Sequence, residues 1–199
     1  MKFYMPTKVY QENDAVMKHA AEIAAIGKKA LIVTGKLSSK KNGSLDDVKK
    51  ALESQNTEYI IYDDIGENPT IDMVMDAAEK GRNNGADFVI GIGGGSPMDV
   101  AKAVGVVAKY GGSITQYEGG GKVPGDIIPL IAIPTTAGTG SEVTAFSVIT
   151  DHSRNYKLTV FSYKLIPAYA ILDAELLTTA PASVAAACGI DAMVHALEA

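Results

Sequence analysis

Residues 91–102, GIGGGSPMDVAK, contain the residue types that proteins use to hold phosphate. Three consecutive glycines, residues 93–95, follow an apolar run, so the chain can turn sharply there and let a ligand touch its backbone. We expect Ser96 to be the N-cap of a following helix, with Asp99 completing a capping box. The first-turn amides and the helix dipole then face a phosphate or pyrophosphate. The alternative is a tight turn without a ligand, for which a single glycine would suffice.

A second loop of similar character covers residues 133–142, IPTTAGTGSE. It also follows an apolar run, and it offers hydroxyl groups together with a flexible backbone. Two such loops after separate strands predict a clamp on an extended ligand that carries two phosphates. The alternative is a long polar loop that binds nothing.

Near the end of the chain, GIDAMVHALEA places Asp191 and His195 four residues apart. On a helix these two side chains share one face, one turn apart. A carboxylate and an imidazole are ligands of divalent metal ions, but a catalytic metal usually takes at least three protein ligands. The spacing alone therefore indicates half a metal site, and an ordinary Asp–His pair on a helix surface is the more common explanation.

The elements that must position these residues alternate between strand and helix. Apolar runs at residues 29–35, 58–64 and 86–93 predict buried strands, and each precedes a helical pattern, at residues 44–56, 68–85 and 96–112. This alternation is typical of parallel strands joined by right-handed helical crossovers. We therefore predict an α/β fold, a doubly wound and mostly parallel sheet. Ligands bind such sheets at the carboxyl ends of the strands, where the glycine loop lies.

The second half of the chain follows a different pattern. Residues 129–134 predict one more buried strand, and the β-forming runs between residues 143 and 172 predict a β-hairpin extension. After Asp173 the sequence is helical in character up to Ala199, where it stops without the glycine, proline or polar tail that usually ends a helix. We expect the chain to be a fragment of a longer protein.

Composition narrows the classes of partner. The chain has 199 residues, of which 47% are hydrophobic and 21% charged, and its net charge of −5 offers no basic field for nucleic acid or an anionic membrane surface. No apolar run approaches the roughly 18 residues of a membrane-spanning helix. The single cysteine, Cys188, excludes an internal disulfide. We expect a cytoplasmic protein that binds neither nucleic acid nor membranes.

Four motifs, taken together and in order, resemble the iron-containing (group III) alcohol dehydrogenase family. They are ENPT at residues 67–70, GIGGGSPMDVAKA at 91–103, IPTTAGTGSEVT at 133–144 and GIDAMVHALEA at 189–199. The resemblance implies a Rossmann-like domain over residues 1–179 that binds NAD or NADP. It also implies that residues 180–199 are the first helix of a C-terminal, all-helical metal-binding domain.

The resemblance also implies roles for individual residues. Two of the four protein ligands of an Fe(II) ion, or in some members a Zn(II) ion, match Asp191 and His195, and the other two are histidines of the C-terminal domain. No residue of this chain is assigned a catalytic role. The positions that match cofactor contacts of the family are Asn68, Gly94, Gly95, Ser96, Asp99, Thr135, Thr136, Thr139 and Lys157.

The residue after the first strand of the predicted cofactor domain bears on the choice of cofactor. Family members that prefer NAD often carry an acid there, which would hold the ribose 2′-hydroxyl and repel a 2′-phosphate. Here that residue is Gly35, and Ser38 and Lys40 follow it. This pattern favours NADP over NAD. The alternative is a solvated, lysine-rich turn.

The resulting functional hypothesis is hydride transfer between a small primary alcohol or aldehyde and a nicotinamide cofactor, dependent on a metal. We expect the isolated chain to be inactive and, because residues 185–199 would expose apolar side chains, to form a homodimer. One alternative is a relative of the dehydroquinate-synthase or glycerol-phosphate-dehydrogenase type. Another is a nucleotide-binding module without catalysis.

Overall fold

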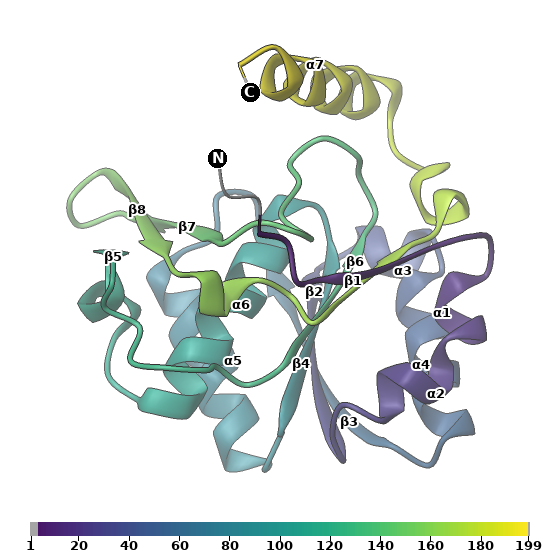
Figure 1. Cartoon of the computed structure of the whole chain (residues 1–199), viewed down its shortest axis with the longest axis horizontal. Coiled ribbons are helices and arrows are strands. Elements are labelled where there is room, and N and C mark those ends of the chain that lie inside the picture. The colour runs from purple at the N-terminus through teal and green to yellow at the C-terminus, as the bar shows by residue number, and fades with distance from the viewer. Residues whose placement is uncertain (1–3, 199) are drawn as a thin grey trace.

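A six-stranded parallel sheet with helices on both faces forms the body of the molecule (Figure 1). The computed structural model describes residues 4–198. The strand order is β1-β9-β6-β4-β2-β3, and every neighbouring pair is parallel. The strands are β1 (Lys8–Gln11), β2 (Lys29–Gly35), β3 (Glu58–Ile65), β4 (Phe88–Gly93), β6 (Leu130–Pro134) and β9 (Tyr169–Leu172).

Two separate hydrophobic cores lie on the two faces of this sheet. Alternate residues of β2 point to opposite faces, as a strand requires: Leu31 lies in the core beneath α5 (Ile71–Asn83) and α6 (Gly95–Tyr110), and Ile32 lies in the other core. That second core is covered by α1 (Ala15–Lys18), α2 (Ala20–Ala24) and α4 (Ser44–Ser54). Burial on both faces explains why these strands are continuously apolar, and it confirms the doubly wound α/β prediction.

The predicted hairpin is also present. Strands β7 (Phe146–Asp151) and β8 (Tyr156–Phe161) are antiparallel, and the short β5 (Gly119–Gly120) pairs with β8. This small sheet packs against α6 through β7. The remaining short elements are α3 (Ser38–Lys41), η1 (Ile114–Tyr117), η2 (Tyr163–Leu165) and η3 (Ala174–Leu177).

Two predicted helices differ from the observed ones. The pattern of residues 13–27, NDAVMKHAAEIAAIG, predicts a single helix, but that helix is broken at His19, whose φ of −106° and ψ of 23° are not helical. Its imidazole lies between the carboxylates of Glu12 and Glu22, with its ring centroid 3.9 Å from that of Tyr10. These contacts hold the side chain where a continuous helix would not place it.

The second difference concerns the C-terminal segment, which is not one helix from Asp173 onward. A 3₁₀ turn, η3, is followed by an interruption, and α7 (Ala182–Glu198) begins directly after Pro181. Proline supplies no amide hydrogen to a preceding turn, and it is favoured just before or at a helix start. Helix α7 has no buried residue and stands beyond the upper edge of the sheet (Figure 1). The predicted domain limits at residues 1 and 199 lie outside the described residues.

Within residues 4–198, no helix combines the length and the apolar character that crossing a bilayer requires.

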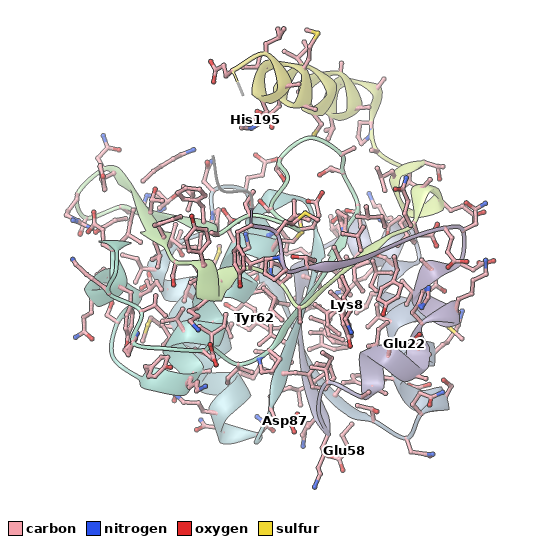
Figure 2. All side chains as sticks on the ribbon, viewed as in Figure 1. Lys8, Glu22, Glu58, Tyr62, Asp87 and His195 are labelled. Atoms are coloured by element: carbon pink, nitrogen blue, oxygen red, sulfur yellow. The ribbon has the colours of Figure 1, made fainter. Side chains whose placement is uncertain are left out.

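The sheet places the loops that follow β2, β4 and β6 at one edge. Strand order reverses between β2 and β4, since the chain adds β3 on one side of β2 and then β4, β6 and β9 on the other. Asp87 and Glu58, at the amino ends of β4 and β3, mark the opposite edge of the sheet from α7 (Figure 2). The carboxyl ends of the strands therefore face α7. Such a reversal is where open α/β sheets leave a crevice for ligands.

Asp87 anchors the amino end of β2, because its carboxylate accepts hydrogen bonds from the backbone amides of Lys28 and Lys29, each at 2.9 Å. We predict that Asp87→Ala lowers the free energy of unfolding by about 1 kcal/mol or more, since two amides lose a charged acceptor. Urea denaturation would measure this. The control is Asp76→Ala, which removes an exposed acid from α5; equal effects in the two variants would contradict the prediction.

Candidate functional site

A crevice of about 570 Å³ lies at the reversal point, between the carboxyl ends of β2 and β4. Its walls are residues 35–38 after β2, residues 65–67 after β3, residues 94–97 at the start of α6, and Thr136. A volume of this size suits a small-molecule or cofactor site. The structure therefore brings Gly35, Ser38 and the glycine loop together, as the sequence predicts.

The glycine loop forms a sharp turn that presents a bare helix start. Gly93 has a φ of 142°, which side chains other than glycine rarely adopt, and a Cβ there would lie 2.8 Å from Cγ of Pro97. The helix begins at Gly95, and Gly94 is its N-cap. Because Gly94 has no side chain, no side chain caps the first-turn amides, which also lack partners within the helix.

This arrangement corrects the prediction for Ser96 and Asp99. Ser96 is not the N-cap but lies inside the first turn, so no capping box forms. The three glycines allow the helix to start earlier than a serine cap would. Ser96 still lines the crevice, whereas Asp99 does not.

The second glycine-containing loop lies directly against the first. A Cβ on Gly94 would lie 3.1 Å from Oγ1 of Thr136, and one on Gly95 would lie 3.3 Å from Cγ2 of Thr139. The backbone of Thr135 also donates to the carbonyl of Gly93, at 2.9 Å. The absence of side chains in the glycine loop is thus what allows the two loops to approach each other.

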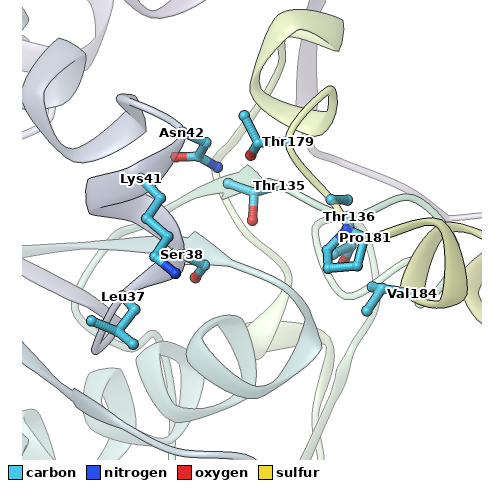
Figure 3. Close-up of a pocket in the computed structure, with 10 residues that line it drawn as sticks. Leu37, Ser38, Lys41, Asn42, Thr135, Thr136, Thr179, Pro181 and Val184 are labelled. Atoms are coloured by element: carbon cyan, nitrogen blue, oxygen red, sulfur yellow. The ribbon is translucent and has the colours of Figure 1, made fainter.

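A second cavity, of about 350 Å³, adjoins the crevice and shares Leu37, Ser38 and Thr136 with it. Figure 3 shows α3, with Ser38, Lys41 and Asn42, on one side of this cavity and Thr135, Thr179 and Pro181 on the other. The two cavities together extend from the glycine loop to the segment that leads into α7.

The lysines after β2 differ in their partners. Lys40 forms an ion pair with Asp63, and Lys36 forms one with Asp64 at 2.7 Å. The Lys40 ammonium, donating a hydrogen bond, lowers the pKa of the Asp63 carboxyl. Lys41, which the sequence analysis did not select, lines the second cavity instead. A four-residue helix gives no periodic signal from which to predict which lysine faces inward.

Four other predicted cofactor residues line neither cavity: Asn68, Asp99, Thr139 and Lys157. Asn68 is exposed, with a left-handed φ of 53°, and it adjoins Glu67, which lines the crevice. Lys157 is exposed on β8. Asp99 joins α6 to β7: its Oδ2 accepts from the amide of Val148 at 3.0 Å, and burial raises the pKa of its carboxyl.

Sequence reasoning also missed Lys102, which is fully buried on α6. Its Nζ donates hydrogen bonds to oxygen atoms of Thr144 and Phe146, beyond the second loop. A lysine within an apolar helical pattern is usually solvated at its tip, so the pattern alone gave no signal for this contact.

Asp191 and His195 share a face of α7, with 3.7 Å between Nε2 and Oδ1. Metal–ligand bonds of about 2.1 Å in a tetrahedral site place two ligand atoms about 3.4 Å apart. The pair thus fits two ligands of one ion with little adjustment. Residues 4–198 contain no cluster of three or more His, Cys, Asp or Glu side chains suited to a metal. His195 lies on the side of α7 turned toward the α/β body (Figure 2).

A doubly wound sheet with a glycine-lined crevice at its reversal point has the architecture of the dinucleotide-binding α/β proteins. Residues 6–174 match the family model described as iron-containing alcohol dehydrogenase, and the chain belongs to this family. The match favours this family over relatives of the dehydroquinate-synthase type.

Individual relatives agree with the family match. The chain is 45% identical over 170 residues to the long-chain primary alcohol dehydrogenase AdhA of Thermoanaerobacter ethanolicus, a match that covers 85% of this chain and 43% of that protein. It is 37% identical over 198 residues to the NAD-dependent methanol dehydrogenase of Bacillus methanolicus, covering 99% of this chain and 52% of the relative.

A solved structure shows the same fold. The crystal structure of an iron-containing alcohol dehydrogenase from Thermotoga maritima superposes with a TM-score of 0.93 at 45% identity, covering 99% of this chain and 54% of that one. The chain thus spans about half the length of the relatives it matches.

Proposed function

We propose that this chain is the cofactor-binding part of an NAD(P)-dependent, metal-dependent alcohol dehydrogenase, which transfers hydride between a primary alcohol or aldehyde and the nicotinamide. The observation that carries the proposal is the uncapped start of α6, which opens into the crevice between β2 and β4. Free first-turn amides and the positive end of the helix dipole suit a pyrophosphate. Membership of the iron-containing alcohol dehydrogenase family supports the reaction class.

In this proposal both loops contact the dinucleotide, each through different groups. Gly94, Gly95 and Ser96 bind the pyrophosphate through backbone amides, as anions are bound at helix starts. Thr135, Thr136 and Thr139 contribute hydroxyl donors from the facing loop, which lies within contact distance of the glycines. The roles proposed for Asn68 and Lys157 rest on the family resemblance alone.

Asp191 and His195 would hold an Fe(II) ion or a Zn(II) ion, because both carboxylate and imidazole groups bind either metal. When bound, the ion supplies Lewis acidity toward an alcohol or carbonyl oxygen. The chain's own contribution is to fix one carboxylate and one imidazole on a single face of α7. Because a catalytic ion requires more than two protein ligands, we expect weak metal retention and little turnover from this chain alone.

We favour NADP over NAD. Gly35 leaves room for a 2′-phosphate beside Ser38, and Lys41 lines the adjoining cavity. Lys40 lies nearby, but its ion pair with Asp63 must be shared with or yielded to a phosphate. The relative from Bacillus methanolicus is described as NAD-dependent, which makes NAD the alternative to test.

We further propose a cytoplasmic homodimer whose ligands are small alcohols or aldehydes and not nucleic acid or membranes. Exposed apolar side chains on α7, Ile190 and Met193 among them, support an association that covers this helix. The net charge of −5 supports the exclusion of polyanionic partners.

We predict that Gly94→Val abolishes binding of both NADP and NAD. Its Cβ would lie 3.1 Å from Oγ1 of Thr136, and its methyl groups would fill the crevice. The backbone angles at Gly94, φ −80° and ψ −162°, are open to valine, so the backbone itself is not strained. Calorimetric titration of the full-length protein measures binding. The control is Gly120→Val, at an exposed glycine that does not line the crevice. Wild-type affinity in Gly94→Val would refute the proposed cofactor site.

A second prediction concerns cofactor choice. Gly35→Asp should weaken NADP binding about tenfold relative to NAD, because the new carboxylate repels the 2′-phosphate. A Cβ at Gly35 has ordinary contact distances, 3.4 Å to Oγ of Ser38, so the side chain fits without strain. Gly35→Asn is the matched neutral control, measured in the same titrations. A wild-type protein that prefers NAD would show that our assignment of NADP is wrong.

A third prediction concerns the metal. In the full-length protein, Asp191→Ala and His195→Ala should each reduce bound iron to a small fraction of the wild-type content, because each variant removes one ligand. Metal analysis of the purified proteins measures this independently of turnover. Glu198→Ala, which removes another acid from α7, should retain its iron. Full iron content in both ligand variants would exclude this pair from the metal site.

A further inference from the structure

Lys102 is a fully buried lysine whose ammonium group donates hydrogen bonds to oxygen atoms of a distant segment. From α6, its Nζ donates to the carbonyl of Thr144 at 2.9 Å, to the hydroxyl of Thr144 at 3.1 Å and to the carbonyl of Phe146 at 2.8 Å. An ammonium group has three protons, and three acceptors surround this one. The side chain thus binds the point where the second loop ends and β7 begins.

These contacts fix the segment just after the second loop, residues 144–146, on the same helix that begins with the glycine loop. The near end of the second loop is held separately, by the hydrogen bond from the amide of Thr135 to the carbonyl of Gly93. Asp99, one turn before Lys102, adds two bonds to β7, through the amide of Val148 and the hydroxyl of Ser147. The loop is therefore held at both ends to β4 and α6.

Burial of this amine is unfavourable by itself. Desolvation lowers the pKa of Lys102 to about 8, against the opposing charges of Asp99 and Glu142. A methionine of similar length would fill the same space without a charge to desolvate, but it would leave the carbonyls of Thr144 and Phe146 without their donor. The lysine at this position therefore serves the geometry of the loop more than the packing of the core.

We propose that Lys102 is a positioning residue for the cofactor crevice: it ties the second loop to α6 and so holds Thr136 and Thr139 against the glycine loop. Lys102 lines neither cavity, so it acts through the loop and not on the dinucleotide. This inference rests on the proposed cofactor function.

A dependence on pH follows from the charge of the amine. Above about pH 8 the neutral amine keeps two protons for the two carbonyls but loses the charge that strengthens these bonds, so it holds the loop more weakly. The charged groups that act on Lys102 are Asp99, from α6, and Glu142, from the loop. If the bound dinucleotide requires the tied loop, it favours the ammonium form and raises the pKa of Lys102. Binding then takes up protons, and affinity falls as the pH rises.

The test is calorimetric titration of NADP into the full-length protein at about pH 7 and about pH 9, on either side of this pKa. Lys102→Met should bind at least about tenfold more weakly than wild type near pH 7. It should also lose the decline in affinity that wild type shows between the two values. Lys109→Met, an exposed lysine on the same helix, should retain both the wild-type affinity and the wild-type decline.

Equal affinity of Lys102→Met and wild type, or an unchanged decline with pH in that variant, would overturn the inference. If Lys102→Met does not fold, as judged by circular dichroism, Thr144→Val decides: it removes one of the three acceptors with little change in shape. It should weaken binding about threefold near pH 7, and wild-type behaviour would overturn the inference. A wild-type protein that binds neither NADP nor NAD would overturn the proposed function as well.

Discussion

The site depends on a helix start, that of α6, which no side chain among residues 4–198 caps. Every α-helix begins with amides that have no partner in the helix, and most proteins satisfy them with a serine, threonine or aspartate side chain. Here Gly94 occupies the N-cap position and Gly93 turns the chain into it. The sheet places this helix start where the strand order reverses, so the helix begins at the wall of a crevice that the second loop also lines through Thr136.

Much of this could be predicted from the sequence, because the determining signals are local. Continuous apolar strands such as β2 and β4 can only be buried on both faces, which requires helices on both sides and hence a doubly wound sheet. The glycine run also predicted the position of the crevice, because few structural roles other than ligand binding need adjacent residues without side chains. The N-cap was predicted wrongly at Ser96, because three glycines make several helix starts sterically possible and the sequence cannot rank them.

The other differences came from contacts between separate segments of the chain. His19 interrupts a good helical pattern because Glu12 and Tyr10 on the preceding segment hold its ring. Lys102 has the spacing of an ordinary helical lysine, and only the hairpin, about forty positions later, buries it. Periodicity reports which face of an element is apolar, but it does not report which polar residue another element will cover.

The second loop connects the parts of the molecule that the proposed reaction needs to bring together. It contacts the glycine loop through Thr136 and Thr139, and it is held on α6 by Lys102. At its tip, Gly138 approaches the backbone of Cys188 on α7 so closely that any side chain on Gly138 would clash. Cys188 lies one helical turn before Asp191, so this contact influences where the candidate metal pair lies relative to the crevice. An element that touches both sites, and is fixed at both ends, is suited to set the distance between a bound nicotinamide and a metal ion. The lack of a side chain at Gly138 therefore allows α7 to approach the second loop, as the lack of side chains at Gly94 and Gly95 allows the two loops to approach each other.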